Sequence, residues 1–362
     1  MTSPTCWGQK HPRTALSSRA HSCSNDVTRD WANIGGDGPT GLIAELVLTN
    51  DVADYVRFRA VCQLWRRCSP DPRAGGLDGR FLPRRWIMLD KAISASPRCH
   101  RFLNMFTGES IRMDLPELAD HRLLTRGQRR ARRMGHGFAV DLGVDGVGIV
   151  ADACMVVVKF DSLTGLAVAK PGSKNWTVVR GRYINSTLMF AGRFYCAAYS
   201  GIMMLDTSGP DKPPRLLVAV KWSMSSISFR PMTDSLHLVD NGGDLLLVHR
   251  MLRPNMVPHD SYRYEVYKVD LSARVLIPVK SFNGRAVFMG MCRAISISAE
   301  AFPCVNRDTL YLGTDCDDKS RIDGCNFANG SNEPRHNDWW VRPSTLVDCL
   351  SCCIRGSGEQ LA

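Results

Sequence analysis

The sequence predicts an α+β protein in which a short helical module near the N-terminus precedes a much longer all-β domain. Residues 39–68 repeat apolar side chains every three to four positions, the spacing of amphipathic helices. From about residue 150 onward, short apolar runs alternate with turns rich in glycine, proline and asparagine, which is typical of strands. The chain of 362 residues, 44% hydrophobic and 22% charged, is long enough to bury a large core.

The helical module begins at Pro39, because a proline at the first helical position lacks only an N–H that would be unpaired there. The first apolar face consists of Leu42, Ile43, Leu46 and Val47. The segment Thr49-Asn50-Asp51 offers side chains that cap a second helix. The apolar face of that helix comprises Val52, Tyr55, Val56, Phe58, Val61, Cys62 and Trp65. Helices this short need tertiary packing, so we expect these faces to cover either the chain's own core or a partner protein.

The order of residues in this module resembles an F-box. The most specific part is the run Phe58-Arg59-Ala60-Val61-Cys62-Gln63-Leu64-Trp65-Arg66. The resemblance implies docking on a Skp-type adaptor and, through it, on a cullin. The adaptor-binding residues that it implies are Pro39, Leu42, Ile43, Leu46, Phe58, Val61 and Trp65. The chain departs from the family where the usual opening Leu-Pro reads Gly38-Pro39, which removes one apolar anchor.

A second, independent resemblance covers the remainder of the chain. Residues 81–118, 290–313 and 339–354 resemble the plant family that couples an F-box to a KIB-type β-propeller. The clearest marks are the segments 101–116 and 302–311. We therefore expect a disordered tail at 1–30, an F-box-like module at 31–72 and a KIB-type β-propeller domain at 80–354.

The strand pattern itself favours a propeller, because short strands recur at a spacing of roughly ten residues. The expected strands lie at 154–160, 176–180, 186–190, 193–199, 202–206, 216–220, 226–229, 235–239, 244–250, 262–269, 274–279, 286–289, 294–298 and 309–312. They predict roughly three or four four-stranded blades, plus strands within 86–113. Residues 125–150 depart from the family pattern and contain an arginine run at 126–133. We therefore expect part of the first or second blade to be missing and the propeller to be incomplete or rearranged.

Composition argues against several other classes of protein. The net charge of +11 (46 basic and 35 acidic residues) raises a nucleic-acid hypothesis, but no helix-turn-helix, zinc-finger or RRM signature accompanies it. The 14 cysteines are expected to be reduced thiols, because the chain is long and lacks a signal sequence. Their only tight cluster, Cys349, Cys352 and Cys353, lacks a second pair at zinc-binding spacing, which argues against a zinc site. Hence we expect no metal, no cofactor and no nucleic-acid partner.

Targeting and catalytic signals are also absent from the sequence. No run of 18 apolar residues exists and the first residues lack the apolar core of a secretory signal, so we expect a cytoplasmic and/or nuclear protein without a membrane partner. No nucleophile elbow, phosphate-binding loop or His-Glu-x-x-His motif occurs, so we expect no catalytic residues.

Two functional hypotheses remain after these exclusions. The chain is either the substrate-recognition subunit of an SCF-type (Skp–cullin–F-box) ubiquitin ligase, with the propeller binding an unknown protein substrate, or a non-ligase interaction propeller with a relict F-box. Gly38 in place of leucine and the irregular stretch 125–150 favour the second hypothesis.

Overall fold

The computed structural model describes residues 39–74, 78–89, 99–116, 144–150, 154–160, 165–170, 172–181, 183–208, 212–222, 234–253, 261–290, 293–313, 316, 324–333 and 350. Three features discussed above lie outside these residues: the expected tail at 1–30, the arginine run at 126–133 and the cysteines at 349, 352 and 353. The expected strand at 226–229 also lies outside them.

Three α-helices and one 3-10 turn form the N-terminal module: α1 (Pro39–Asn50), α2 (Val52–Ala60), α3 (Gln63–Arg67) and η2 (Gly79–Phe81). Asp51 caps α2 as predicted, with its carboxylate accepting from the N–H of Ala53 at 2.7 Å. The predicted second helix, however, breaks after Ala60. Cys62 takes an extended conformation and its Sγ accepts from the N–H of Trp65, so that α3 starts as a separate helix.

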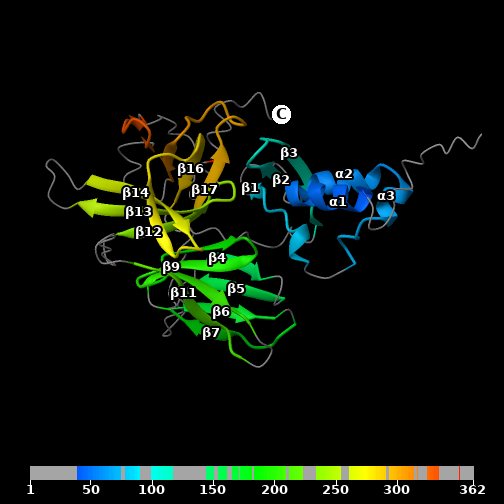
Figure 1. Cartoon of the computed structure of the whole chain (residues 1–362), viewed down its shortest axis with the longest axis horizontal. Helices are drawn as coiled ribbons and strands as arrows, with labels where there is room; N and C mark the ends of the chain where they lie inside the picture. Colours follow the sequence, from blue (N-terminus) through cyan, green and yellow to red (C-terminus); the bar gives the residue numbers. More distant parts are fainter. Residues whose placement is uncertain are drawn as a thin grey trace, which may run out of the picture.

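Five sheets make up the rest of the described chain, as the blades of a propeller (Figure 1). The first sheet comprises β1 (Trp86–Leu89), β2 (Cys99–Asn104) and β3 (Ser110–Asp114); the second, β4 (Val144–Val150), β5 (Met155–Phe160), β6 (Gly165–Ala169) and β7 (Thr177–Arg180); the third, β8 (Ser186–Phe190), β9 (Arg193–Ala198), β10 (Gly201–Asp206) and β11 (Arg215–Lys221). The fourth comprises β12 (Ser235–Asp240), β13 (Leu245–Arg253), β14 (Ser261–Asp270) and β15 (Val275–Val279); the fifth, β16 (Arg285–Met289), β17 (Ala294–Ser298), β18 (Thr309–Leu312), β19 (Gly324–Asn326) and β20 (Asn332–Glu333).

The second sheet corrects one sequence-based expectation. Strand β4 lies within the stretch that departs from the family pattern, yet it pairs with β5 and gives the second sheet four antiparallel strands. Strand β6, with the sequence Gly-Leu-Ala-Val-Ala, was not predicted, because glycine and alanine carry little of the β-branched signal that marks a strand. Three strands of the first sheet lie in the described part of the chain.

The hydrophobic core is divided among the interfaces between neighbouring blades. Tyr195 and Ile202 of the third sheet pack with Leu236 and Leu247 of the fourth. The first sheet packs on the fifth, where Leu103 joins Phe288 in one cluster. The N–H of Ser298 also donates to the carbonyl oxygen of Met105 at 3.1 Å. The N-terminal blade is thereby held against the C-terminal one.

The interface between the second and third blades provides a test of this packing. A methyl group added at Gly148 on β4 would lie 2.5 Å from a ring carbon of Phe194 on β9. We expect Gly148→Ala to lower the free energy of unfolding by about 1–3 kcal/mol, measured by urea denaturation, because the two blades would have to move apart.

Phe194→Leu supplies the matched control in a double-mutant cycle. The shorter side chain leaves room for the added methyl group, so the double variant should lose less stability than the sum of the two single variants. Strictly additive losses would show that Gly148 does not set the distance between the blades.

Candidate partner-binding surface

The helical module leaves one set of apolar side chains exposed. Leu42 and Leu46 of α1 are each 71% exposed, and Ile43 is 47% exposed. Val61, in the break between α2 and α3, is 63% exposed. We refer to Leu42, Ile43, Leu46 and Val61 as the module surface. These exposed apolar side chains make the module a candidate site for a protein partner.

A different set of side chains forms the module's own core. Ala44, Leu48, Tyr55 and Phe58 are buried together, and Val47, Val52, Trp65 and Phe81 pack against them. Phe58 and Trp65 stack with their ring centroids 4.4 Å apart. The module therefore has a core that does not use the module surface.

The seven residues expected to bind an adaptor thus divide into two groups. Pro39 and the four residues of the module surface are exposed. Phe58 is buried and Trp65 is half-buried, and both act within the module. Val56, 53% exposed on α2, was not among the predicted site residues, although the spacing of apolar residues had already placed it on an amphipathic face. Whether any of these residues contacts an adaptor stays a prediction.

The C-terminal end of the module is tied down by hydrogen bonds to backbone carbonyls. The hydroxyl of Tyr55 donates to the carbonyl oxygen of Pro70 at 2.7 Å. The Arg59 guanidinium donates to the carbonyl oxygens of Arg66, Ser69 and Pro70. These contacts hold α3 and the residues after it against α2, which keeps the position of Val61 fixed.

A buried carboxylate attaches the module to the first blade. Besides capping α2, Asp51 accepts from the indole N–H of Trp86, with Oδ2 3.0 Å from Nε1, and from the amide of Asn104, with Oδ2 2.8 Å from Nδ2. We call the hydrogen bonds that Asp51 accepts from Ala53, Trp86 and Asn104 the Asp51 latch. On the surface, Arg57 contacts both Asp54 and Glu109, and the hydrogen bond that Arg57 donates to the Glu109 carboxylate is the main cause of its raised pKa.

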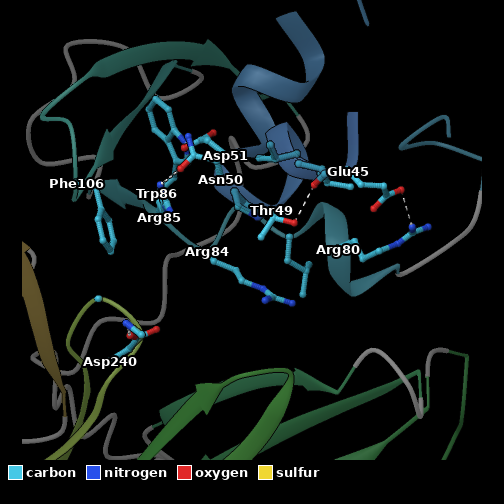
Figure 2. Close-up of a pocket in the computed structure, with 16 residues that line it drawn as sticks. Glu45, Thr49, Asn50, Asp51, Arg80, Arg84, Arg85, Trp86, Phe106 and Asp240 are labelled. Carbon is cyan, nitrogen blue, oxygen red and sulfur yellow. Dashed lines mark hydrogen bonds and ion pairs between the residues drawn. The ribbon is translucent and has the colours of Figure 1, made fainter. Parts of the chain in front are cut away.

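A pocket of about 310 Å³ lies beside the latch, between the module, the segment 80–86 and the turn that joins β12 to β13 (Figure 2). Arg80 at its edge pairs with Glu45 at 3.2 Å and with Asp78 at 2.8 Å. The hydrogen bonds between Arg80 and Asp78 lower the pKa of Asp78 and raise that of Arg80. We call this cavity the seam pocket.

Two further observations bear on the kind of site. Within the described ranges, His, Cys, Asp and Glu side chains do not form any group of three that could hold a metal ion. None of the helices described here is long and apolar enough to cross a membrane.

Comparisons with known proteins bear on the propeller. The model of the KIB1-4 beta-propeller family matches residues 79–337. The search of curated proteins finds no match. Among solved structures, an α-L-arabinanase of Cellvibrio cellulosa is similar at 10% identity over 51% of this chain and 69% of that chain. Its TM-score of 0.23 is too low to support any argument about this protein.

The Asp51 latch can be tested by one isosteric substitution. Asp51→Asn replaces an acceptor oxygen with an N–H₂ group, so the buried donors of Trp86 or Asn104 lose a partner. We expect the free energy of unfolding to fall by about 2–3 kcal/mol, measured by urea denaturation followed by tryptophan fluorescence.

Asp54→Asn is the matched control, because it makes the same chemical change on an exposed carboxylate of the same helix. It should leave the unfolding midpoint almost unchanged. If both variants lost the same stability, the latch would contribute nothing beyond surface charge.

Proposed function

Since the chain belongs to the KIB1-4 beta-propeller family, we propose that it is the substrate-recognition subunit of an SCF-type ubiquitin ligase. In this proposal the helical module docks on a Skp-type adaptor, and through it on a cullin, while the propeller binds a protein substrate. The observation that carries the proposal is the exposure of Leu42, Ile43, Leu46 and Val61 on a module whose core is complete without them.

The proposed docking places a few apolar anchors in a groove of the adaptor. Burying one leucine contributes about 1.5–3 kcal/mol, so the module surface has enough apolar side chains to dominate an interface. The chain itself would transfer no ubiquitin, since catalysis would belong to the other subunits of the ligase. A cytoplasmic and/or nuclear location accords with this role.

The Asp51 latch and the stacking of Phe58 on Trp65 favour a second candidate, a non-ligase interaction propeller that keeps the module as a support for its first blade. In that case the module would be needed for folding but would bind no adaptor. The two candidates differ in whether the module surface has a partner.

Co-expression with a Skp-type adaptor followed by size-exclusion chromatography distinguishes the two candidates. For the ligase subunit we expect a stoichiometric complex with the wild-type chain and its loss with Leu42→Arg, because a charge would be buried in an apolar groove. Leu42→Arg should not unfold the propeller, since Leu42 is exposed in the free chain.

Val178→Arg is the matched control, because Val178 lies on β7 of the second blade and is 56% exposed. It should retain the complex. A soluble wild-type chain that forms no adaptor complex would reject the ligase proposal and favour the interaction propeller, as would a complex that survives both Leu42→Arg and Leu46→Arg.

A further inference from the structure

The seam pocket brings together arginines that differ in how far their charge is compensated. Arg80 contacts the two carboxylates of Asp78 and Glu45. Arg84 instead donates to a neutral acceptor, the carbonyl oxygen of Gly79, at 3.1 Å. Within the part of the chain that the structure describes, no carboxylate forms an ion pair with Arg84. Arg84 lines the pocket from the segment between module and blades, and its side chain extends away from Phe106 and Asp240 (Figure 2).

Arg85 is the second arginine of the pocket without an ion pair to a described carboxylate. Its Nη1 donates to Oδ1 of Asn50 at 2.7 Å, and its guanidinium lies 4.8 Å from the centre of the Phe106 ring. These contacts fix the side chain while they leave its positive charge uncompensated. A guanidinium has five N–H donors, and among the described residues the guanidiniums of Arg84 and Arg85 each donate to a single acceptor.

A third guanidinium adds positive charge on the far side of Phe106. Arg285 lies 4.4 Å from the centre of the same ring and donates to Ser296. Burial lowers the pKa of Arg285, and the positive charge of Arg85 lowers it further. The negative charge of Asp240 raises the same pKa and so offsets part of the decrease. The guanidiniums of Arg85 and Arg285 thus both lie against Phe106 at this end of the pocket.

Each carboxylate that lines the pocket already accepts from protein donors. Asp240 accepts from the N–H of Gly243 at 2.8 Å, and Asp51 accepts the donors of the latch. Glu45 faces Arg80. Arg84 and Arg85 are therefore the lining arginines for which no described carboxylate forms an ion pair.

We propose that the seam pocket binds a small polyanion, a molecule with two or more phosphate groups, through Arg84 and Arg85. Planar guanidiniums match phosphate oxygens with paired hydrogen bonds. The volume of about 310 Å³ suits a small ligand and excludes a folded domain. This inference does not depend on the proposed ligase function.

The position of the pocket gives the ligand a structural role. Its walls come from the helical module, from the segment 80–86 and from the β12–β13 turn of the fourth blade. A ligand that contacts all three stabilises their native arrangement, because it binds the folded protein and not the unfolded chain. The polyanion thus fixes how the module surface is presented relative to the propeller.

Isothermal titration calorimetry of the full-length chain with inorganic pyrophosphate, at constant ionic strength in chloride, tests the proposal. We expect saturable binding of one pyrophosphate per chain by the wild type and weaker binding of inorganic phosphate. The double variant Arg84→Gln/Arg85→Gln should bind pyrophosphate at least about tenfold more weakly, because it loses the charge-assisted hydrogen bonds.

Arg112→Gln/Arg180→Gln is the matched control. It removes the same charge from two exposed arginines that do not line the pocket, and its affinity should equal that of the wild type. An equal loss of pyrophosphate affinity in both double variants would show that binding depends on net charge alone and would overturn the proposal. So would the absence of saturable binding by the wild type.

Asn50→Asp guards against a double variant that fails to fold. It keeps every arginine but places a carboxylate beside Nη1 of Arg85, where the amide oxygen now lies at 2.7 Å. We expect this built-in anion to lower the affinity for pyrophosphate by about tenfold while the chain stays folded. Unchanged affinity in this variant would remove Arg85 from the site and contradict the proposal.

Discussion

The buried carboxylate of Asp51 is the interaction on which the arrangement of module and propeller depends. A buried charge is costly unless it is hydrogen-bonded, and here the donors come from helix α2, from Trp86 on β1 and from Asn104 on β2. The network continues from Asn104, whose Oδ1 accepts from the N–H groups of Phe106 and Thr107. That turn in turn contacts the fifth blade through Met105. A short series of polar contacts thus links the first helices to the last blade.

In the helical module, the side chains that form the core are different from those that are exposed. Ala44, Leu48, Tyr55 and Phe58 fill its interior, whereas Leu42, Ile43 and Leu46 lie outside. A change on the exposed face should therefore have little effect on folding, whereas a change in the interior should destabilise the module. Under the proposed docking, the exposed face alone would determine binding. This division allows the exposed face to be shaped by a partner alone.

Local patterns in the sequence predicted most of the strands and the cap of α2. The strands at 186–190 and 294–298 have the predicted limits, since they combine β-branched residues with clear turn signals. The break after Ala60 was not predicted, because apolar spacing continues across it while Cys62 is extended. Periodicity marks which residues share a helix face, but it does not tell which face the chain itself will cover.

The candidate sites were predicted unevenly for a physical reason. The module surface lies within one continuous segment, so its residues could be named from spacing and family resemblance. The seam pocket joins Arg85, Phe106 and Asp240, which come from three separate parts of the chain. Nothing local in the sequence marks such a meeting point, because it arises only when the blades close on the module.

The Asp51 latch also bears on where the foldable unit begins. The family match starts at residue 79, downstream of Asp51, yet the side chains of Trp86 and Asn104 depend on that upstream carboxylate. A propeller trimmed to the matched region would expose two donors that have no acceptor left in the chain's interior. The region that the family match covers and the region that this hydrogen-bond network ties together therefore have different N-terminal limits.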